Sequence, residues 1–62
     1  MTKADALEYF KENILPGVRK AYEQDGQVDA IARREEWNNW TDMLCKDGTI
    51  TDDQYNNWDN PF

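Results

Sequence analysis

The residues best suited to chemistry lie in a glycine-containing turn of the sequence, Lys46-Asp47-Gly48-Thr49-Ile50-Thr51. A glycine followed two residues later by isoleucine also occurs in the calcium-binding loop of EF-hands, where carboxylates at fixed positions bind the ion. With Gly48 at the sixth position of such a loop, the first and third ligand positions fall on Met43 and Cys45. The position of the bidentate glutamate falls on Gln54. Calcium therefore lacks its carboxylates, and we interpret the turn as a corner between two helices.

The carboxylate pairs Glu35-Glu36 and Asp52-Asp53 are the remaining candidates for acid and base catalysis. Neighbouring residues of a helix point in different directions, and nothing in the sequence predicts a pocket that would bury either pair. The chain has no histidine and one cysteine, Cys45, so a thiol nucleophile lacks an imidazole partner and structural zinc lacks ligands. We expect a protein that is not an enzyme and uses no metal or other cofactor.

Two similar aromatic pairs lie eighteen residues apart, in Trp37-Asn38-Asn39-Trp40 and Tyr55-Asn56-Asn57-Trp58. Each pair places two large rings three positions apart, on one face of a helix. The four rings can pack together as the core, where aromatic contacts add to the free energy of burial. Alternatively, one ring of each pair stays exposed as an anchor for a partner, as tryptophan and tyrosine often do at interfaces.

Acidic residues outnumber basic ones by thirteen to seven, and the formal net charge is −6. The excess lies near the carboxyl end, where residues 42–62 carry five Asp and only one basic residue, Lys46. Such a charge repels nucleic acids and anionic membranes and favours a basic partner. We predict that Asp47, Asp52 and Asp53 form an acidic rim around the aromatic anchors. Carboxylates spaced like phosphates would also allow nucleic-acid mimicry.

The first expected element is an amphipathic helix from about residue 3 toward residue 24, because apolar residues recur there at spacings of three and four. Pro16 interrupts the pattern, since proline has no N–H and clashes with the preceding turn. The segment is either one helix kinked near Ile14 or two helices, with Pro16 opening the second. The continuous apolar pattern favours the kink.

A second long helix is expected after the turn at Asp25-Gly26, with Val28 and Ile31 beginning its apolar stripe and its end near Lys46. Within it, Asp29 and Arg33 form a candidate i, i+4 ion pair. Gly48 predicts the stop of this helix, because glycine accepts the left-handed conformation that follows many helices.

A capping box at Thr51 and Gln54 then predicts a short helix, which ends at Asn60-Pro61. Phe62 either folds back on the core or stays free. The predicted fold class is therefore all-α: a compact helical bundle of two longer helices, the first kinked or broken at Pro16, and a short third one.

Residues 1–62 are expected to form a single helical domain, because so short a chain has room for one core only. The expected core combines Phe10 and the three tryptophans with surrounding aliphatic residues, listed as Leu7, Ile14, Leu15, Val18, Ile31, Leu44 and Ile50. Without a signal peptide, an internal disulfide or an apolar stretch of membrane length, the expected location is the cytoplasm.

The segment 41–48, the run Gln54-Tyr55-Asn56-Asn57-Trp58 and the final Asn60-Pro61-Phe62 resemble small uncharacterised accessory proteins of tailed bacteriophages. The resemblance implies a host-cytoplasm setting and a protein that binds one host protein; it transfers no catalytic or ligand residues. We expect an inhibitor or modulator of a host protein, with a nucleic-acid-binding protein as one candidate partner. The alternative is a structural role in a virion or assembly complex, in which the helices associate with copies of themselves.

Overall fold

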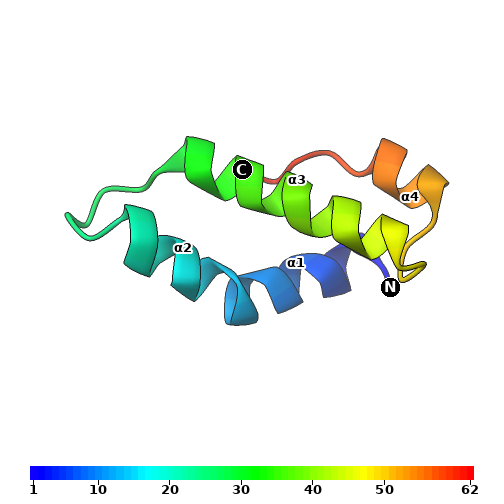
Figure 1. Ribbon diagram of the computed structural model, residues 1–62, viewed down its shortest axis with the longest axis horizontal. Helices are drawn as coiled ribbons and strands as arrows, with labels where there is room; N and C mark the ends of the chain where they lie inside the picture. Colours follow the sequence, from blue (N-terminus) through cyan, green and yellow to red (C-terminus); the bar gives the residue numbers. More distant parts are fainter.

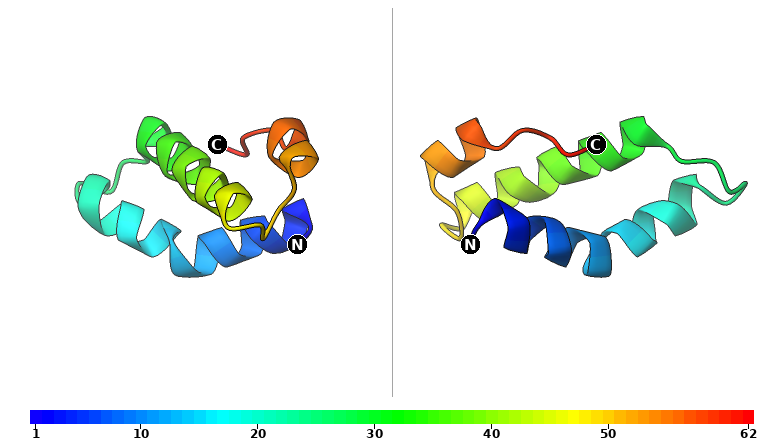
Figure 2. Two further views of the ribbon diagram at one scale, coloured as in Figure 1. Left: turned by 45° about the vertical axis from the view of Figure 1, so that its right-hand side comes forward. Right: turned by 180° about the vertical axis from the view of Figure 1, so that it is seen from behind.

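The computed structural model describes all 62 residues and contains four α-helices and no strand. Helices α1 (Lys3–Asn13) and α2 (Leu15–Tyr22) form a bent arm, and α3 (Ala30–Lys46) runs back antiparallel to it (Figure 1). Helix α4 (Asp52–Asn57) lies at the carboxyl end of α3, and the chain after it returns along α3 (Figure 2). The molecule measures 37 × 18 × 18 Å. The predicted all-α bundle is confirmed.

The first helical segment is broken rather than kinked, so the alternative favoured by the apolar pattern is wrong. Ile14 ends α1 and precedes α2, and Pro16 occupies the first turn of α2, where its missing N–H is least costly. The backbone of Ile14 keeps a right-handed helical conformation, with φ −110° and ψ −44°. The N–H of Ile14 still donates to the Phe10 carbonyl at 2.9 Å. The two helices therefore join at a bend around Ile14 and share one inner face (Figure 1).

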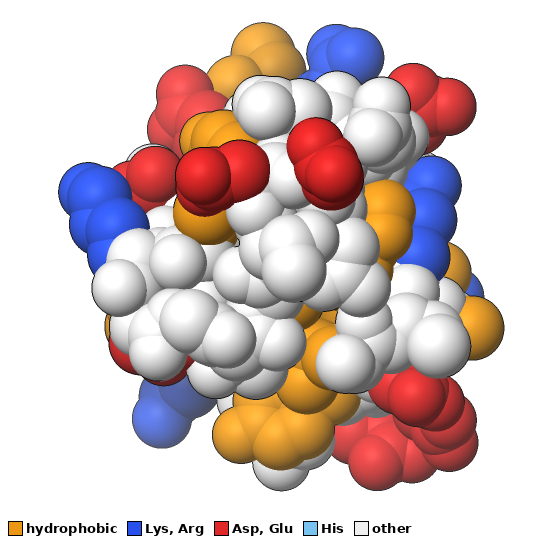
Figure 3. All heavy atoms as spheres, turned by 90° about the vertical axis from the view of Figure 1, so that its right-hand side faces the viewer, with side chains coloured by type: hydrophobic (Ala, Val, Ile, Leu, Met, Phe, Trp, Pro, Cys, Tyr) orange, Lys and Arg blue, Asp and Glu red, His pale blue; other side chains and the backbone are white.

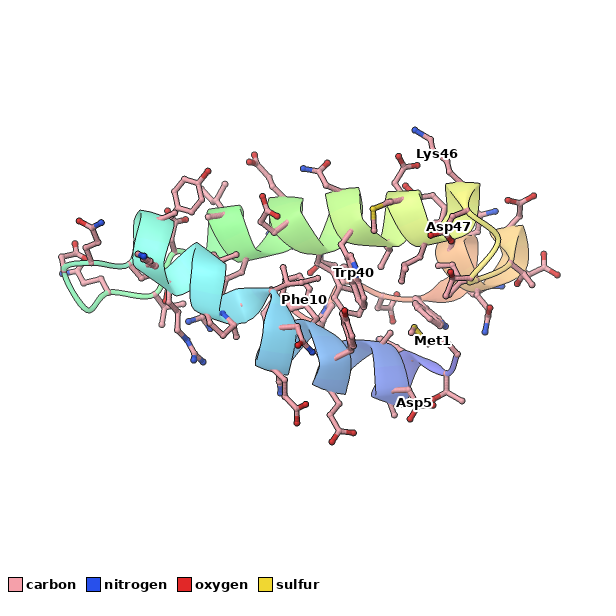
Figure 4. All side chains as sticks on the ribbon, turned by 60° about the horizontal axis from the view of Figure 1, so that its bottom comes forward. Met1, Asp5, Phe10, Trp40, Lys46 and Asp47 are labelled. Atoms are coloured by element: carbon pink, nitrogen blue, oxygen red, sulfur yellow. The ribbon has the colours of Figure 1, made fainter.

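That inner face packs on α3 through a cluster of aromatic rings. Phe10 is fully buried, and its ring centroid lies 5.4 Å from that of Trp37 and 5.7 Å from that of Trp40. Figure 4 shows Phe10 and Trp40 between α1 and α3. The rest of the buried hydrophobic core comes from α1, α2, α3 and the turn after α3. These residues are Ala6, Leu15, Val18, Ala32, Leu44 and Ile50. Thr41 is also buried, and its hydroxyl donates to the Trp37 carbonyl at 2.9 Å.

The chain after α4 closes the aromatic cluster from a third side. The Phe62 ring lies 5.3 Å from that of Phe10 and 6.3 Å from that of Trp37, so Phe62 folds back on the core. The Asn60 amide holds this segment in place, because it donates to the Arg34 carbonyl at 3.2 Å and to Asn38 Oδ1 at 3.1 Å. Helix α4 itself ends at Asn57, three residues before the predicted end at Asn60.

The turn between α2 and α3 is held by a contact that the sequence pattern did not predict. Arg33 pairs with Glu23, with Nη2 2.6 Å from Oε1 and Nε 2.7 Å from Oε2. Asp29 instead caps α3, and its carboxylate accepts from the Ala32 N–H at 3.0 Å. The expected pair of Asp29 and Arg33 is therefore wrong, because the bidentate contact with Glu23 uses the guanidinium and the cap uses the carboxylate.

Val28 and Ile31 were also expected on the buried stripe and are exposed, by 65% and 70%. Helix α3 begins only at Ala30, which leaves Val28 in the preceding turn. Ile31 lies about 120° round the helix from the buried Trp37, at roughly 100° per residue. It lies beside Tyr22, where α2 ends, and stays uncovered, so the prediction that it belongs to the core is wrong.

The last turn of α3 and the start of α4 follow the predicted signals. The Thr49 N–H donates to the Leu44 carbonyl at 2.9 Å and the Gly48 N–H to the Cys45 carbonyl at 3.2 Å, which is a Schellman motif. Gly48 adopts φ +83°. The capping box between Thr51 and Gln54 is present, with both hydrogen bonds formed. Local backbone requirements therefore determine this corner.

We expect Gly48→Ala to lower the free energy of unfolding by about 1–2 kcal/mol, because a Cβ is strained at positive φ. No atom lies within 4 Å of that Cβ, so the effect would be conformational. Gly17→Ala is the matched control: its Cβ also meets open space, but Gly17 is helical, and alanine there should add about 0.5–1 kcal/mol. Chemical denaturation of both variants measures the difference. Equal effects of the two substitutions would contradict this account of the corner.

A second expectation concerns Glu23, whose pKa is held below its ordinary value by the hydrogen bonds from Arg33. The pKa of Glu23 is lower in the folded than in the unfolded chain, where it is about 4.3. The contact with Arg33 therefore stabilises the fold fully above that pH, and this stabilisation is lost as the pH falls through the folded pKa. Glu23→Gln should therefore lower the melting temperature at neutral pH and reduce its fall in acid. The control is Glu8→Gln, which removes an exposed carboxylate without a partner. Parallel pH profiles for wild type and Glu23→Gln would refute the assignment.

Candidate functional site

The predicted acidic residues lie together at the end of the molecule formed by the α3–α4 turn and α4. Asp47 follows the last residue of α3, Asp52 and Asp53 occupy the first turn of α4, and Tyr55 lies in the next turn. All four side chains are exposed, and we call them the acidic face. Figure 3 views this end directly: Asp and Glu side chains stand in the upper middle and at the lower right, and Lys and Arg side chains appear only toward the outline.

Asp47 is fixed by the turn that it follows. One of its oxygens, Oδ1, accepts from the Thr49 hydroxyl at 2.6 Å and from the Thr49 N–H at 2.9 Å. These hydrogen bonds favour the ionised carboxylate and lower the pKa of Asp47. Figure 4 shows Asp47 at the corner where α3 ends. The second carboxylate oxygen, Oδ2, makes no hydrogen bond within the chain, so Asp47 presents a positioned negative charge.

Helix α4 is held at its two ends and has no fully buried side chain of its own. Before it, Ile50 is buried, and after it Trp58 packs partly buried against the core. Gln54 adds a contact that no pattern in the sequence indicates, because its amide donates to the Met1 carbonyl at 2.8 Å, 53 residues away. Most of the α4 surface is thus presented outward while its backbone is anchored.

Few cations of the chain compensate these charges. The ammonium group of Lys46 lies 2.9 Å from an Asp42 carboxylate oxygen, and this hydrogen bond raises the pKa of Lys46. Apart from the contact between Arg33 and Glu23, it is the only ion pair in the structure. Asp47, Asp52 and Asp53 therefore have no basic partner within the protein.

The aromatic residues predicted as anchors divide into two groups. Trp37 and Trp40 are 2% and 8% exposed, so they belong to the core, as one of the two alternatives held. Trp58 is half-buried, whereas Tyr55 is 38% exposed. The two pairs differ in burial because α3 packs along α1 and α2, whereas α4 is held mainly by the residues at its two ends. Tyr55 is the most exposed of the four predicted aromatic rings.

Cys45 connects the end of α3 to α4. Its thiol donates to Asp52 Oδ1 at 3.1 Å, a contact between residues that lie seven positions apart. This hydrogen bond, with partial burial and the charges of Asp52 and Asp42, raises the pKa of the Cys45 thiol. The thiolate is therefore disfavoured, and Cys45 helps to orient Asp52.

The structure contains no group of three or more Cys, Asp or Glu side chains near enough to hold a metal ion. None of the four helices combines the length and the apolar character that a membrane span requires. No protein-family model, curated protein or solved structure matches this chain.

If Asp52 suppresses ionisation of Cys45, then Asp52→Asn should lower the pKa of the thiol and speed its reaction with a disulfide reagent several-fold near pH 8, at about the pKa of a free thiol. The measurement is the rate of thiol modification against pH. Asp53→Asn is the control, because it removes the neighbouring charge without touching the sulfur. The same midpoint in wild type and Asp52→Asn would exclude the contact.

Proposed function

We propose that this chain is a non-enzymatic binding protein whose acidic face docks on a basic surface of another protein and thereby modulates or blocks it. One observation carries the proposal: Asp47, Asp52, Asp53 and Tyr55 are all exposed at one end of the molecule, where no cation of the chain pairs with the carboxylates. A positive partner would supply the missing counter-charges.

The two kinds of side chain on this face contribute differently to binding. Exposed carboxylates mainly raise the association rate and select against wrong partners. Tyr55 offers apolar area and a hydroxyl, the combination found at the energetic centres of many interfaces. Because α4 is anchored at both ends, little conformational entropy is lost when the face is covered.

Proteins that bind nucleic acids carry basic surfaces of the required kind, which makes them the preferred partner class. The bacteriophage resemblance adds a host-cytoplasm setting to the proposal. In that setting the acidic face would occupy the phosphate-binding surface of a host protein, and added nucleic acid would compete with it.

The test is affinity capture from bacterial lysate with tagged wild-type protein and the triple variant Asp47→Asn, Asp52→Asn, Asp53→Asn. Asparagine keeps the hydrogen-bond acceptor at each position and removes only the charge. We expect one retained protein, released by salt or by added DNA, with binding to the variant at least about tenfold weaker. Three charge pairs of about 0.5 kcal/mol each together account for roughly a tenfold change in affinity.

The matched control is Asp5→Asn, Glu8→Gln, Glu12→Gln, which makes the same change in net charge on α1. This control should retain the partner as wild type does. Three outcomes would overturn the proposal: equal capture by both triple variants, capture of nothing, and recovery of only untagged copies of the same chain.

A further inference from the structure

The opposite end of the molecule exposes large apolar side chains next to one another. Ile31, Val28 and Tyr22 are 70%, 65% and 57% exposed, the three highest values among the large hydrophobic residues of the chain. We call these three residues the loop-end patch. They lie at the end of α2, in the turn and in the first turn of α3. Exposed apolar side chains that gather in one place mark interaction sites more often than isolated ones do.

Two shallow hollows adjoin these side chains. One has a volume of about 390 Å³ and is lined by all three residues of the patch together with Asp25. The other, of about 150 Å³, is lined by Tyr22 and Ile31 with Glu35 and Glu36. The apolar surface is therefore indented and bordered by carboxylates, a shape that can take side chains from a partner.

The turn that carries Val28 has a fixed conformation. Glu23 Oε2 accepts from Arg33 and also from the Asp29 N–H at 3.1 Å. Asp25 Oδ1 accepts from the Gln27 N–H at 3.0 Å, and Gly26 turns the chain with φ +82°. The patch is consequently preorganised, and a partner need not order the turn on binding.

The charge around the patch selects the kind of partner. The two hollows are lined by four carboxylates, those of Asp25, Asp29, Glu35 and Glu36, and by no basic residue. The nearby cations Arg19, Lys20 and Arg34 line neither hollow. Arg33 is engaged by Glu23. Glu35 and Glu36 have no cation partner in the chain. Two copies that met through this patch would bring the carboxylates of both together, which opposes self-association. A partner with Lys or Arg beside its apolar residues would complement them.

We propose that the loop-end patch is a second docking surface, which takes a basic amphipathic helix of another protein. The structure offers no strand edge for an extended peptide to pair with, so recognition must use side chains. An amphipathic helix supplies apolar side chains at i, i+3 and i+4 to the hollows and basic ones to Asp25, Glu35 and Glu36.

This surface does not depend on the acidic face. The α2–α3 turn and α4 lie at opposite ends of the long axis, which measures 37 Å (Figure 1). Both surfaces can therefore be occupied at once, and the protein would connect a basic surface at one end to a basic helix at the other.

The test uses the whole chain, labelled with ¹⁵N, and a synthetic peptide of about 18 residues with Leu at i, i+3, i+4 and i+7 and Lys elsewhere. A second peptide has the same composition with the leucines dispersed. We expect the first peptide to shift the amide signals of residues 22–36 selectively, with affinity that falls as salt is added. The dispersed peptide should bind at least about tenfold more weakly.

Paired variants test the residues. Val28→Ser, Ile31→Ser should weaken binding of the first peptide at least about tenfold, since both remove exposed anchors without touching the core. Met43→Ser, which changes an exposed apolar residue elsewhere on α3, should leave the affinity unchanged. Glu35→Gln, Glu36→Gln should reduce the salt dependence, whereas Glu8→Gln, Glu12→Gln should not.

Each remaining outcome would overturn the proposal. Absence of binding, or shifts centred on α4, would show that the patch is not the docking surface for such a helix. Equal binding of the two peptides would show a purely electrostatic contact. Concentration-dependent shifts of residues 22–36 without peptide would assign the patch to a second copy. The triple variant of the acidic face should bind the peptide as wild type does, so the two proposals can fail separately.

Discussion

The ring of Phe10 holds three parts of the chain together, since Trp37, Trp40 and Phe62 all lie around it. These contacts join α1 to α3 and bring the end of the chain back over the core. Aromatic rings dominate because a chain of 62 residues must obtain most of its buried area from a few large side chains. The core is therefore short and central, and both ends of the long axis lie beyond it.

This placement explains which parts of the fold could be predicted from sequence. The helix stop at Gly48 and the capping box at Thr51 depend on residues within six positions of one another, so their signals are local. Periodicity also identified the helices. Periodicity could not show that α2 is too short to cover Ile31, because the apolar pattern of one helix does not reveal how far the neighbouring helix extends. Arg33 was assigned the wrong partner for a related reason, since Glu23 lies in another element.

The candidate site was predictable to a similar degree. The exposure of Asp52 and Asp53 follows from their place in the first turn of a short helix, where charge is favourable and burial is not. The separation of Tyr55 from Trp37 and Trp40 depends on tertiary packing, since the two asparagine-containing segments look alike in sequence. The contact of Gln54 with Met1, which fixes α4, joins residues 53 positions apart and has no local signal.

The net negative charge of the chain explains how large apolar residues can stay exposed without causing self-association. Val28, Ile31 and Tyr22 would promote self-association on a neutral protein, because exposed apolar area is the main attraction between copies. A net charge of −6 on every copy opposes that encounter and leaves attraction to basic partners intact. Specificity would then come from the difference in free energy between binding a second copy and binding a basic partner, rather than from apolar contact alone. Under the two proposals, the same carboxylates would keep copies apart and determine which partners can reach either end of the molecule.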